Sequence, residues 1–102
     1  MNDLVEKHLI LCNQLNSIYE QKNNAYGNSF GETFEKLGII SAITRISDKY
    51  SRLVNLATHP EINKGDEAIE DTLLDMANYC LMTYMELQKE NNGEVNGEVK
   101  KE

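Results

Sequence analysis

The sequence IISAITRISDKYSRLVNLA, residues 39–57, decides the fold class of this chain. Its apolar residues recur every three or four positions, as they do along one face of an α-helix. The stripe consists of Ile39, Ile43, Ile46, Tyr50 and Leu53. Because Ile40, Val54 and Leu56 widen the apolar arc, we expect more than one neighbouring element to cover this helix.

Two further helical patterns lie on either side of this stretch. One is predicted over residues 2–23, with Asn2 as its N-cap and an apolar face formed by Leu4, Leu11, Leu15, Ile18 and Tyr19. The other is predicted over residues 67–90, with Asp66 as its cap and a buried side formed by Ile69, Leu73, Met76, Cys80, Tyr84 and Leu87. The isolated His8 and Cys12 fall near the first apolar face, so we interpret both as packing residues.

The segment AYGNSFGETFEKLG, residues 25–38, interrupts the helical pattern. Gly27 and Gly31 supply flexible backbone, and the Asn-Ser pair between them favours turns. We therefore predict a loop with one short helical turn over residues 33–37. The segment contains three aromatic residues, Tyr26, Phe30 and Phe34. Rings of this size must pack against the core or against a flat ligand.

These patterns predict an all-α fold, a helical bundle of three main helices plus a short helical turn, with no strand. We expect one domain over residues 1–90, with a loop over residues 58–66, and a disordered polar tail over residues 91–102. A chain of 102 residues buries only about 60–65% of the surface that it exposes when unfolded. We therefore expect oligomerisation to complete the bundle.

The composition argues against several classes of function. The formal net charge of −7 disfavours nucleic acid or an anionic membrane as the main partner, although it allows a local basic pocket for a small anion. The first residues have no signal-peptide pattern and no stretch has the ~18 apolar residues of a membrane span, so we expect a cytoplasmic protein. Cys12 and Cys80 lie far apart, which predicts buried thiols in a reducing compartment. With only His8 and His59 beside them, we expect no structural zinc site.

Four charged residues of the helix over residues 39–57 share one narrow face. They are Arg45, Asp48, Lys49 and Arg52, at positions i, i+3, i+4 and i+7. Three cations this close repel one another, and one carboxylate cannot neutralise them. A phosphate or diphosphate would neutralise them, and an arginine binds such a group with forked hydrogen bonds. The alternative is a solvated face with one or two internal ion pairs, which contribute little to stability.

The helix over residues 67–90 carries a face of oxygen ligands. Asp71, Asp75 and Asn78 fall at i, i+4 and i+7, with Glu67 one turn earlier. Carboxylate and amide oxygens at this spacing suit Mg²⁺, and Asp71 and Asp75 are the predicted ligands. Acids in the first turns of a helix also offset the helix dipole. That explains Glu67, but it explains Asp75 poorly because Asp75 lies more than two turns into the helix.

Two interpretations of these faces stay open. The cationic and anionic faces form salt bridges with each other across the bundle, or they frame a cleft in which a metal-bound phosphate lies between them. The sequence has no motif for nucleophilic catalysis, for a phosphate-binding loop or for dinucleotide binding. If the protein is an enzyme, only attack by metal-activated water fits its residues.

Most of the chain, about residues 18–90, resembles a family found widely in phages and prophages, the nucleotide modification associated domain, type one. The resemblance rests on separated motifs in the family's order: Lys22, Tyr26-Gly27, Ser29-Phe30, Arg45-x-x-Asp48-Lys49-x-x-Arg52-Leu53, Glu70-Asp71-Thr72, Asp75 and Asn78-Tyr79. It implies a phage protein that handles a phosphorylated nucleotide in the cytoplasm of a bacterial host cell.

The helix pair is more distantly similar to the all-α nucleoside triphosphate pyrophosphatases of the MazG and dimeric dUTPase kind. Those enzymes bind Mg²⁺ through an EExxE motif on one helix and an ExxD motif on the next. Here residues 48–52 read Asp-Lys-Tyr-Ser-Arg, and residues 71–75 read Asp-Thr-Leu-Leu-Asp. The similarity implies a dimeric or helix-swapped all-α core. Since Lys49 and Arg52 replace metal-binding acids, the departure favours direct phosphate contact over a multi-metal site.

The expected site is a nucleotide-phosphate pocket between the helices over residues 39–57 and 67–90, closed by the loop around Tyr26 to Phe30. We expect it to be formed by Lys22, Tyr26, Asn28, Phe30, Arg45, Asp48, Lys49, Arg52 and Asn78, with Asp71 and Asp75 as a Mg²⁺ site. Three functions fit this site. The protein is a non-catalytic binder that sequesters a nucleotide, such as a host immune signal, or a Mg²⁺-dependent nucleotide pyrophosphatase or hydrolase, or a helical module that binds another protein.

Overall fold

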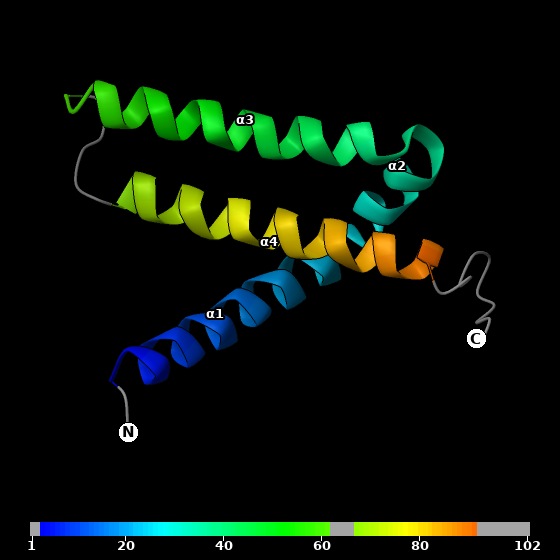
Figure 1. Ribbon diagram of the computed structural model, residues 1–102, viewed down its shortest axis with the longest axis horizontal. Helices are drawn as coiled ribbons and strands as arrows, with labels where there is room; N and C mark the ends of the chain where they lie inside the picture. Colours follow the sequence, from blue (N-terminus) through cyan, green and yellow to red (C-terminus); the bar gives the residue numbers. More distant parts are fainter. Residues whose placement is uncertain (1–2, 62–66, 92–102) are drawn as a thin grey trace.

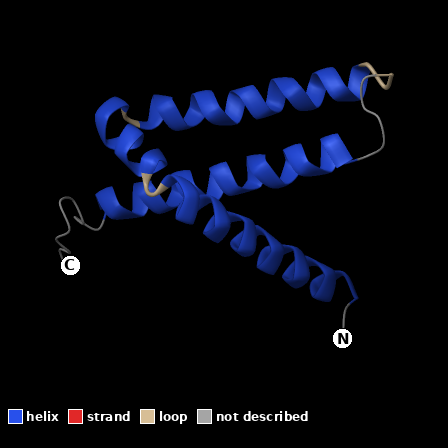
Figure 2. Cartoon of the chain, turned by 180° about the vertical axis from the view of Figure 1, so that it is seen from behind, coloured by secondary structure: helices blue, strands red, loops and turns tan. Residues whose placement is uncertain are grey.

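The computed structural model describes residues 3–61 and 67–91, and all regular secondary structure in these ranges is helical (Figures 1 and 2). The helices are α1 (Asp3–Tyr26), α2 (Ser29–Leu37), α3 (Ile39–Thr58) and α4 (Glu67–Asn91). The predicted all-α fold is therefore confirmed. The predicted tail beyond Asn91, and residues 62–66 of the predicted loop, lie outside the described residues. Within the two described ranges, no helix combines the length and apolarity that a membrane span needs.

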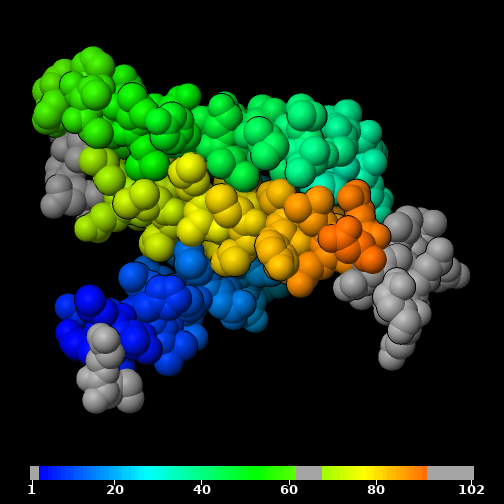
Figure 3. Space-filling view, viewed as in Figure 1, coloured from blue at the N-terminus to red at the C-terminus, as the bar shows by residue number. Residues whose placement is uncertain are grey.

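The long helices α3 and α4 lie side by side and antiparallel (Figure 1). The short helix α2 turns the chain from the end of α1 into the start of α3. Helix α1 meets α4 at an angle, so that its C-terminal part approaches α2 and α4 while its N-terminal part diverges from α3 (Figures 1 and 2). In the space-filling view, the N-terminal half of α1 stands apart from α3 (Figure 3). All four helices come together only around the C-terminal part of α1.

The segment predicted as a loop is mostly helical. Helix α1 continues to Tyr26, and Gly27 ends it with a left-handed φ of 67° that an amino acid with a side chain rarely adopts. The Gly27 N–H donates to the Asn23 carbonyl oxygen at 2.8 Å. Helix α2 then begins at Ser29 rather than at the predicted position 33. The predicted loop is therefore wrong, and only two residues separate α1 from α2.

Packing explains why α2 is longer than its sequence suggests. The ring of Phe34 is only 2% exposed, which fixes α2 against the rest of the molecule. Gly31, also in α2, permits a close approach, because a Cβ there would lie 2.7 Å from the Asn28 side chain and 2.9 Å from Glu86 Oε2. Glycine and serine have low helix propensity, but propensity is a weak prior that such tertiary contacts override.

The interior of the described chain is small and partly polar. Its buried apolar residues are Phe34, Ala42 and Leu56, and its buried polar residues are Thr72, Asn78 and Thr83. The hydroxyl groups of Thr72 and Thr83 donate to carbonyl oxygens four residues earlier, at 2.6 and 2.7 Å. The Asn78 Nδ2 donates to the Leu15 carbonyl oxygen of α1 at 3.1 Å. Each buried polar side chain therefore has a partner, as burial requires.

The apolar side predicted for α4 is only partly buried. Leu73 and Tyr84 are 51% and 64% exposed, and Cys80 is exposed as well. Positions 72, 78 and 83 face inward instead. The prediction is therefore wrong for Leu73, Cys80 and Tyr84. Helices α3 and α1 supply polar partners to Thr72 and Asn78, which hydrophobic periodicity does not detect.

Helix α1 has no buried residue. Leu11 is 48% exposed, whereas Leu15, Ile18 and Tyr19 are half-buried. His8 and Cys12 are exposed, and the Cys12 Sγ lies 3.6 Å from the His8 Nδ1. The interpretation of these two as packing residues is wrong for the single chain, as is the expectation of buried thiols, because the N-terminal half of α1 diverges from the other helices.

Candidate functional site

Two adjoining cavities lie where the four helices meet. The larger has a volume of about 460 Å³ and the smaller of about 280 Å³. Arg45 of α3 and Tyr79 of α4 line both of them. The two cavities therefore adjoin, and the larger one has the size that small-molecule sites have.

The larger cavity is lined by aromatic rings and amides. The rings are those of Tyr19, Tyr26, Phe30 and Tyr79, and the amides are those of Asn23, Asn28 and Asn78. Phe30 and Tyr79 contact each other with their ring centroids 6.0 Å apart and their planes tilted by 56°. Tyr26 is 73% exposed and lies at the mouth of the cavity. Such a lining offers a planar ligand both apolar faces and hydrogen-bonding groups.

The smaller cavity is cationic. Arg45, Lys49 and Arg52 line it from successive turns of α3, together with Asp48. The Arg52 Nε donates to the Thr72 hydroxyl at 3.0 Å, and the Lys49 Nζ lies 6.0 Å from the centre of the Tyr79 ring. These contacts hold Arg52 and Lys49 in place.

Arg45 differs from the other cations of the site. It is exposed, and it makes no hydrogen bond or ion pair with any residue in the two described ranges. It lines both cavities. A guanidinium carries five donors in a planar fork, so Arg45 can hold an anion without first giving up an internal partner.

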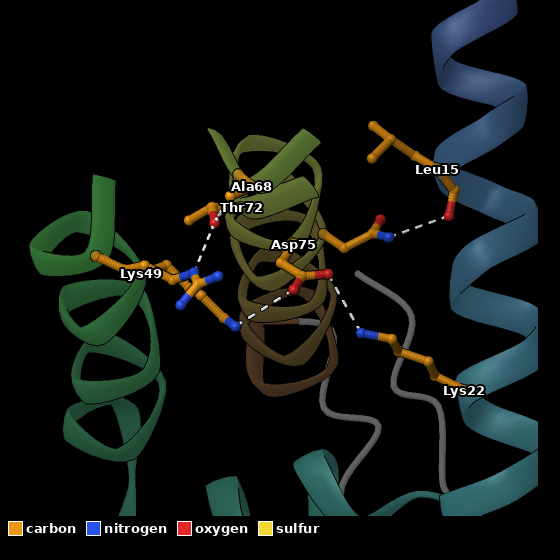
Figure 4. Close-up of polar contacts among 8 residues, drawn as sticks. Leu15, Lys22, Lys49, Ala68, Thr72 and Asp75 are labelled. Atoms are coloured by element: carbon orange, nitrogen blue, oxygen red, sulfur yellow. Dashed lines mark hydrogen bonds and ion pairs between the residues drawn. The ribbon is translucent and has the colours of Figure 1, made fainter. Parts of the chain in front are cut away.

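Asp75 lies between two lysines from different helices (Figure 4). Its Oδ1 is 3.2 Å from the Lys22 Nζ of α1, and its Oδ2 is 3.3 Å from the Lys49 Nζ of α3. The side chains of Asp75 and Lys49 are each 27% exposed, and that of Lys22 is 58% exposed. One carboxylate of α4 thus joins three helices at the wall of the larger cavity.

The structure brings together nearly all residues that the sequence predicted for the site. All nine predicted nucleotide-binding residues, and Asp75, line one or both cavities. Asp71 is exposed and lines neither cavity. The element that closes the larger cavity is not the predicted loop, because Tyr26 belongs to α1 and Phe30 to α2.

Four further residues with large side chains line the larger cavity, and the sequence interpretation missed them as site residues: Tyr19, Asn23, Tyr79 and Met82. The signal for two of them was present. Tyr19, Asn23 and Tyr26 are spaced i, i+4 and i+7, which places them on one helical face. Ending the predicted helix at residue 23 hid that spacing, since it assigned Tyr26 to a loop.

The first interpretation of the charged faces, salt bridges between them, is realised in part, and a metal-bound phosphate between them stays a prediction. Lys49 and Asp75 form a salt bridge across α3 and α4, and Arg52 contacts Thr72 rather than an acid. Arg45 takes no part in this pairing. The faces therefore contact each other and also leave a cavity with one cation that has no partner among the described residues.

The described acids do not fit a magnesium site in this arrangement. No group of three His, Cys, Asp or Glu side chains is close enough to hold a metal ion within residues 3–61 and 67–91. Asp71 does not line the larger cavity. Each carboxylate oxygen of Asp75 lies beside a lysine ammonium group. An ammonium group at this distance competes with a cation for the same oxygen. The magnesium requirement stays a prediction.

The fold and its cavities define an all-α domain with an aromatic cavity beside a cationic one. A comparison with protein families shows that the chain belongs to the family of nucleotide modification associated domain 1, whose model matches residues 22–87. The resemblance seen in the sequence is thereby confirmed. The match includes every described cavity residue except Tyr19. Comparisons with curated proteins and with solved structures gave no match.

Proposed function

We propose that this protein binds a phosphorylated nucleotide in the two adjoining cavities and does not turn it over. The observation that carries the proposal is Arg45, a cation without a partner in the described chain, at the junction of an aromatic cavity and a cationic one. The domain family, whose name refers to nucleotide modification, supports the same ligand class.

The chemistry of the lining matches the two halves of a nucleotide. A base would lie among Tyr26, Phe30 and Tyr79, where stacking on an aromatic ring contributes about 1–3 kcal/mol per base in single-strand binders. The phosphates would lie at Arg45, whose forked donors bind phosphate bidentately. Backbone and side-chain amides near Asn28 would bind base edges or sugar hydroxyls.

Binding without turnover fits the acids of the site better than hydrolysis does. A magnesium-dependent hydrolase would need Asp71 and Asp75 to act on one ion, and Asp75 is instead paired with Lys22 and Lys49. We extend the proposal to sequestration: a phage protein of this type would hold a nucleotide immune signal in the cytoplasm of its bacterial host.

The test is a panel of nucleotides incubated with the purified full-length protein, with and without Mg²⁺. The panel contains nucleoside mono-, di- and triphosphates, dinucleotides, cyclic oligonucleotides and ADP-ribose. Free ligand is quantified by mass spectrometry before and after heat denaturation. We expect at least one ligand to disappear and to return intact on heating. A ligand that returns as a product would replace this proposal by the hydrolase.

Arg45→Glu is the decisive variant for the same panel. It replaces the phosphate-binding donor by a repelling charge, so we expect the affinity for the bound ligand to fall about 100-fold or more. Lys36→Glu is the matched control, because Lys36 is an exposed cation of α2 that lines neither cavity. Equal affinity of wild type and Arg45→Glu would mean that the ligand does not bind at Arg45, and it would contradict the proposed site.

We further propose that the protein is a homo-oligomer in which a second copy covers apolar faces of α1 and α3. On α3 the exposed apolar residues are Ile40, Ile43, Tyr50 and Val54, with exposed fractions of 68%, 48%, 59% and 43%. Their spacing of i, i+3, i+10 and i+14 is the heptad spacing with which helices of identical chains pack on each other. Sedimentation velocity tests this, and a purely monomeric protein would favour the third function, a module for a different protein partner.

A further inference from the structure

We infer that Asp75 and Asp48 limit the negative charge of the ligand, so that the cavities take a nucleotide with two phosphate charges in preference to a triphosphate. This inference rests on the proposed function, because it concerns the ligand class of the same cavities. It adds a role for two carboxylates that nucleotide binding alone does not require.

The charge of the lining is small and positive. Its cations are Lys22, Arg45, Lys49 and Arg52, and its carboxylates are Asp48 and Asp75. Four cationic side chains against two carboxylates leave the described lining with two net positive charges, on a chain whose formal net charge is −7. A ligand with two negative charges neutralises this lining, whereas a ligand with about four leaves an excess that the surrounding acidic protein repels.

Asp75 occupies the place of an anion. Its two oxygens lie 3.2 and 3.3 Å from the ammonium groups of Lys22 and Lys49, the groups to which a phosphate oxygen would otherwise bind. A phosphate that reaches these lysines must share them with Asp75, and its charge then lies next to a carboxylate of like sign. Since Asp75 is only 27% exposed, water screens this repulsion less than it would at the surface.

Asp48 acts at the other end of the same row. It lines the smaller cavity beside Lys49 and Arg52, and it makes no hydrogen bond or ion pair with the described residues. Its carboxylate therefore keeps its charge available to repel a phosphate chain that extends beyond Arg45 along α3. Arg45 lines both cavities, and each cavity has one carboxylate in its described lining, so this cation suits one compact pair of phosphate charges.

Three kinds of ligand share this chemistry. A nucleoside monophosphate, a nucleotide with a bridging diphosphate such as ADP-ribose, and a cyclic dinucleotide with two phosphodiesters each carry about two negative charges at neutral pH, against about four for a triphosphate. The experiment compares one member of each kind with the triphosphate. All four probes carry the base that binds best in the nucleotide panel.

The affinities are measured by isothermal titration calorimetry on the full-length protein, at fixed ionic strength and without divalent cations. We expect wild type to bind at least one two-charge probe about tenfold or more tightly than the triphosphate. Asp75→Asn should shrink this ratio about tenfold, mainly because the triphosphate binds more tightly. Asp71→Asn is the matched control, since it removes the same charge one turn earlier on α4 at an exposed position outside the cavities, and it should leave the ratio unchanged.

Asp48→Asn provides an independent arm, because Asp48 has no partner in the described chain whose loss would affect folding. It should shift the ratio in the same direction as Asp75→Asn, and it keeps the inference testable if Asp75→Asn does not fold. Equal weakening of all probes by Asp75→Asn would overturn the inference and show that Asp75 contacts the ligand directly. So would an unchanged ratio in Asp48→Asn. If wild type bound none of the nucleotides in the panel, the proposed function itself would be wrong.

Discussion

Around the cavities, polar side chains are buried and partnered, whereas along the N-terminal half of α1, apolar side chains are exposed. Thr72 and Asn78 are 2% and 9% exposed, and each makes a hydrogen bond to another helix. Ile10 of α1 is 63% exposed. This is the reverse of the usual distribution, in which apolar residues fill the interior.

The difference separates two tasks within one short chain. The polar interior fixes charged groups such as Lys49 and Asp75 at the walls of the two cavities, as the proposed ligand binding requires. The apolar surface of α1 contributes nothing to that cavity until the helix reaches Tyr19. Because exposed apolar faces of this kind mark interaction sites, we expect assembly and the proposed ligand binding to depend on different parts of the molecule.

Phe34→Ala should have the largest effect, because it removes the most buried large side chain around the cavities. The ring is 2% exposed, and its loss should lower the free energy of unfolding by about 3–5 kcal/mol. Urea denaturation followed by circular dichroism measures this. Leu37→Ala in the same helix is the matched control, since Leu37 is 68% exposed and its loss should cost at most about 0.5 kcal/mol. An equal loss in the free energy of unfolding for the two variants would contradict the conclusion that the chain's interior lies around the cavities.

Asn78→Ala should detach α1 from α4. The Asn78 amide donates to the Leu15 carbonyl oxygen, and the variant removes this bond between the helices and leaves a gap at a buried position, at a cost of about 1–3 kcal/mol. Hydrogen exchange should therefore accelerate in the C-terminal half of α1 more than in α3. Asn55→Ala, at an exposed position of α3, is the control and should leave the exchange unchanged. Uniform acceleration in all helices would mean that the helices unfold as one unit.

The sequence predicted the long helices and the cationic face better than it predicted what α4 buries. The spacing of Arg45, Lys49 and Arg52 depends only on helix geometry, so the pattern suffices to place them on one face. The buried side of α4 depends on which groups its neighbours present. Hydrophobicity favours Leu73, but the single chain buries Thr72, because Arg52 of α3 donates to its hydroxyl.

Helix α2 shows a second limit of sequence interpretation. Its first residues, Ser-Phe-Gly, have the composition of a turn, and the burial of Phe34 and the close approach of Gly31 to the Glu86 side chain favour the helix. That contact joins residues more than fifty positions apart, which no local pattern encodes. The aromatic residues of this segment were nevertheless a sound signal, since Tyr26 and Phe30 both line the larger cavity.

Thr72→Val should have an intermediate effect that sharpens the contrast between buried and exposed polar groups. Valine keeps the shape of threonine but removes the acceptor for the Arg52 Nε, so we expect a loss of about 1–2 kcal/mol in the free energy of unfolding. Thr44→Val is the matched control. The Thr44 hydroxyl also donates to a carbonyl oxygen four residues earlier, at 2.8 Å, but Thr44 is exposed. An equally large loss of stability in Thr44→Val would mean that the hydroxyl bond within the helix, and not the contact with Arg52, causes the loss in Thr72→Val.

Leu11→Lys should have the smallest effect on the single chain and a clear effect on assembly. Leu11 is 48% exposed on α1, so a charged side chain there should change the stability of the isolated chain by at most about 0.5 kcal/mol. If a second copy covers α1, the same charge enters an apolar interface and should shift the protein from oligomer to monomer in sedimentation velocity. Asn13→Lys adds the same charge at an exposed polar position of α1 and should leave assembly unchanged.

A monomeric Leu11→Lys that still binds nucleotide would show that the cavities bind their ligand without the second copy. Loss of binding on dissociation would instead mean that α1 holds its cavity residues, Tyr19 to Tyr26, in place only when its N-terminal half is covered.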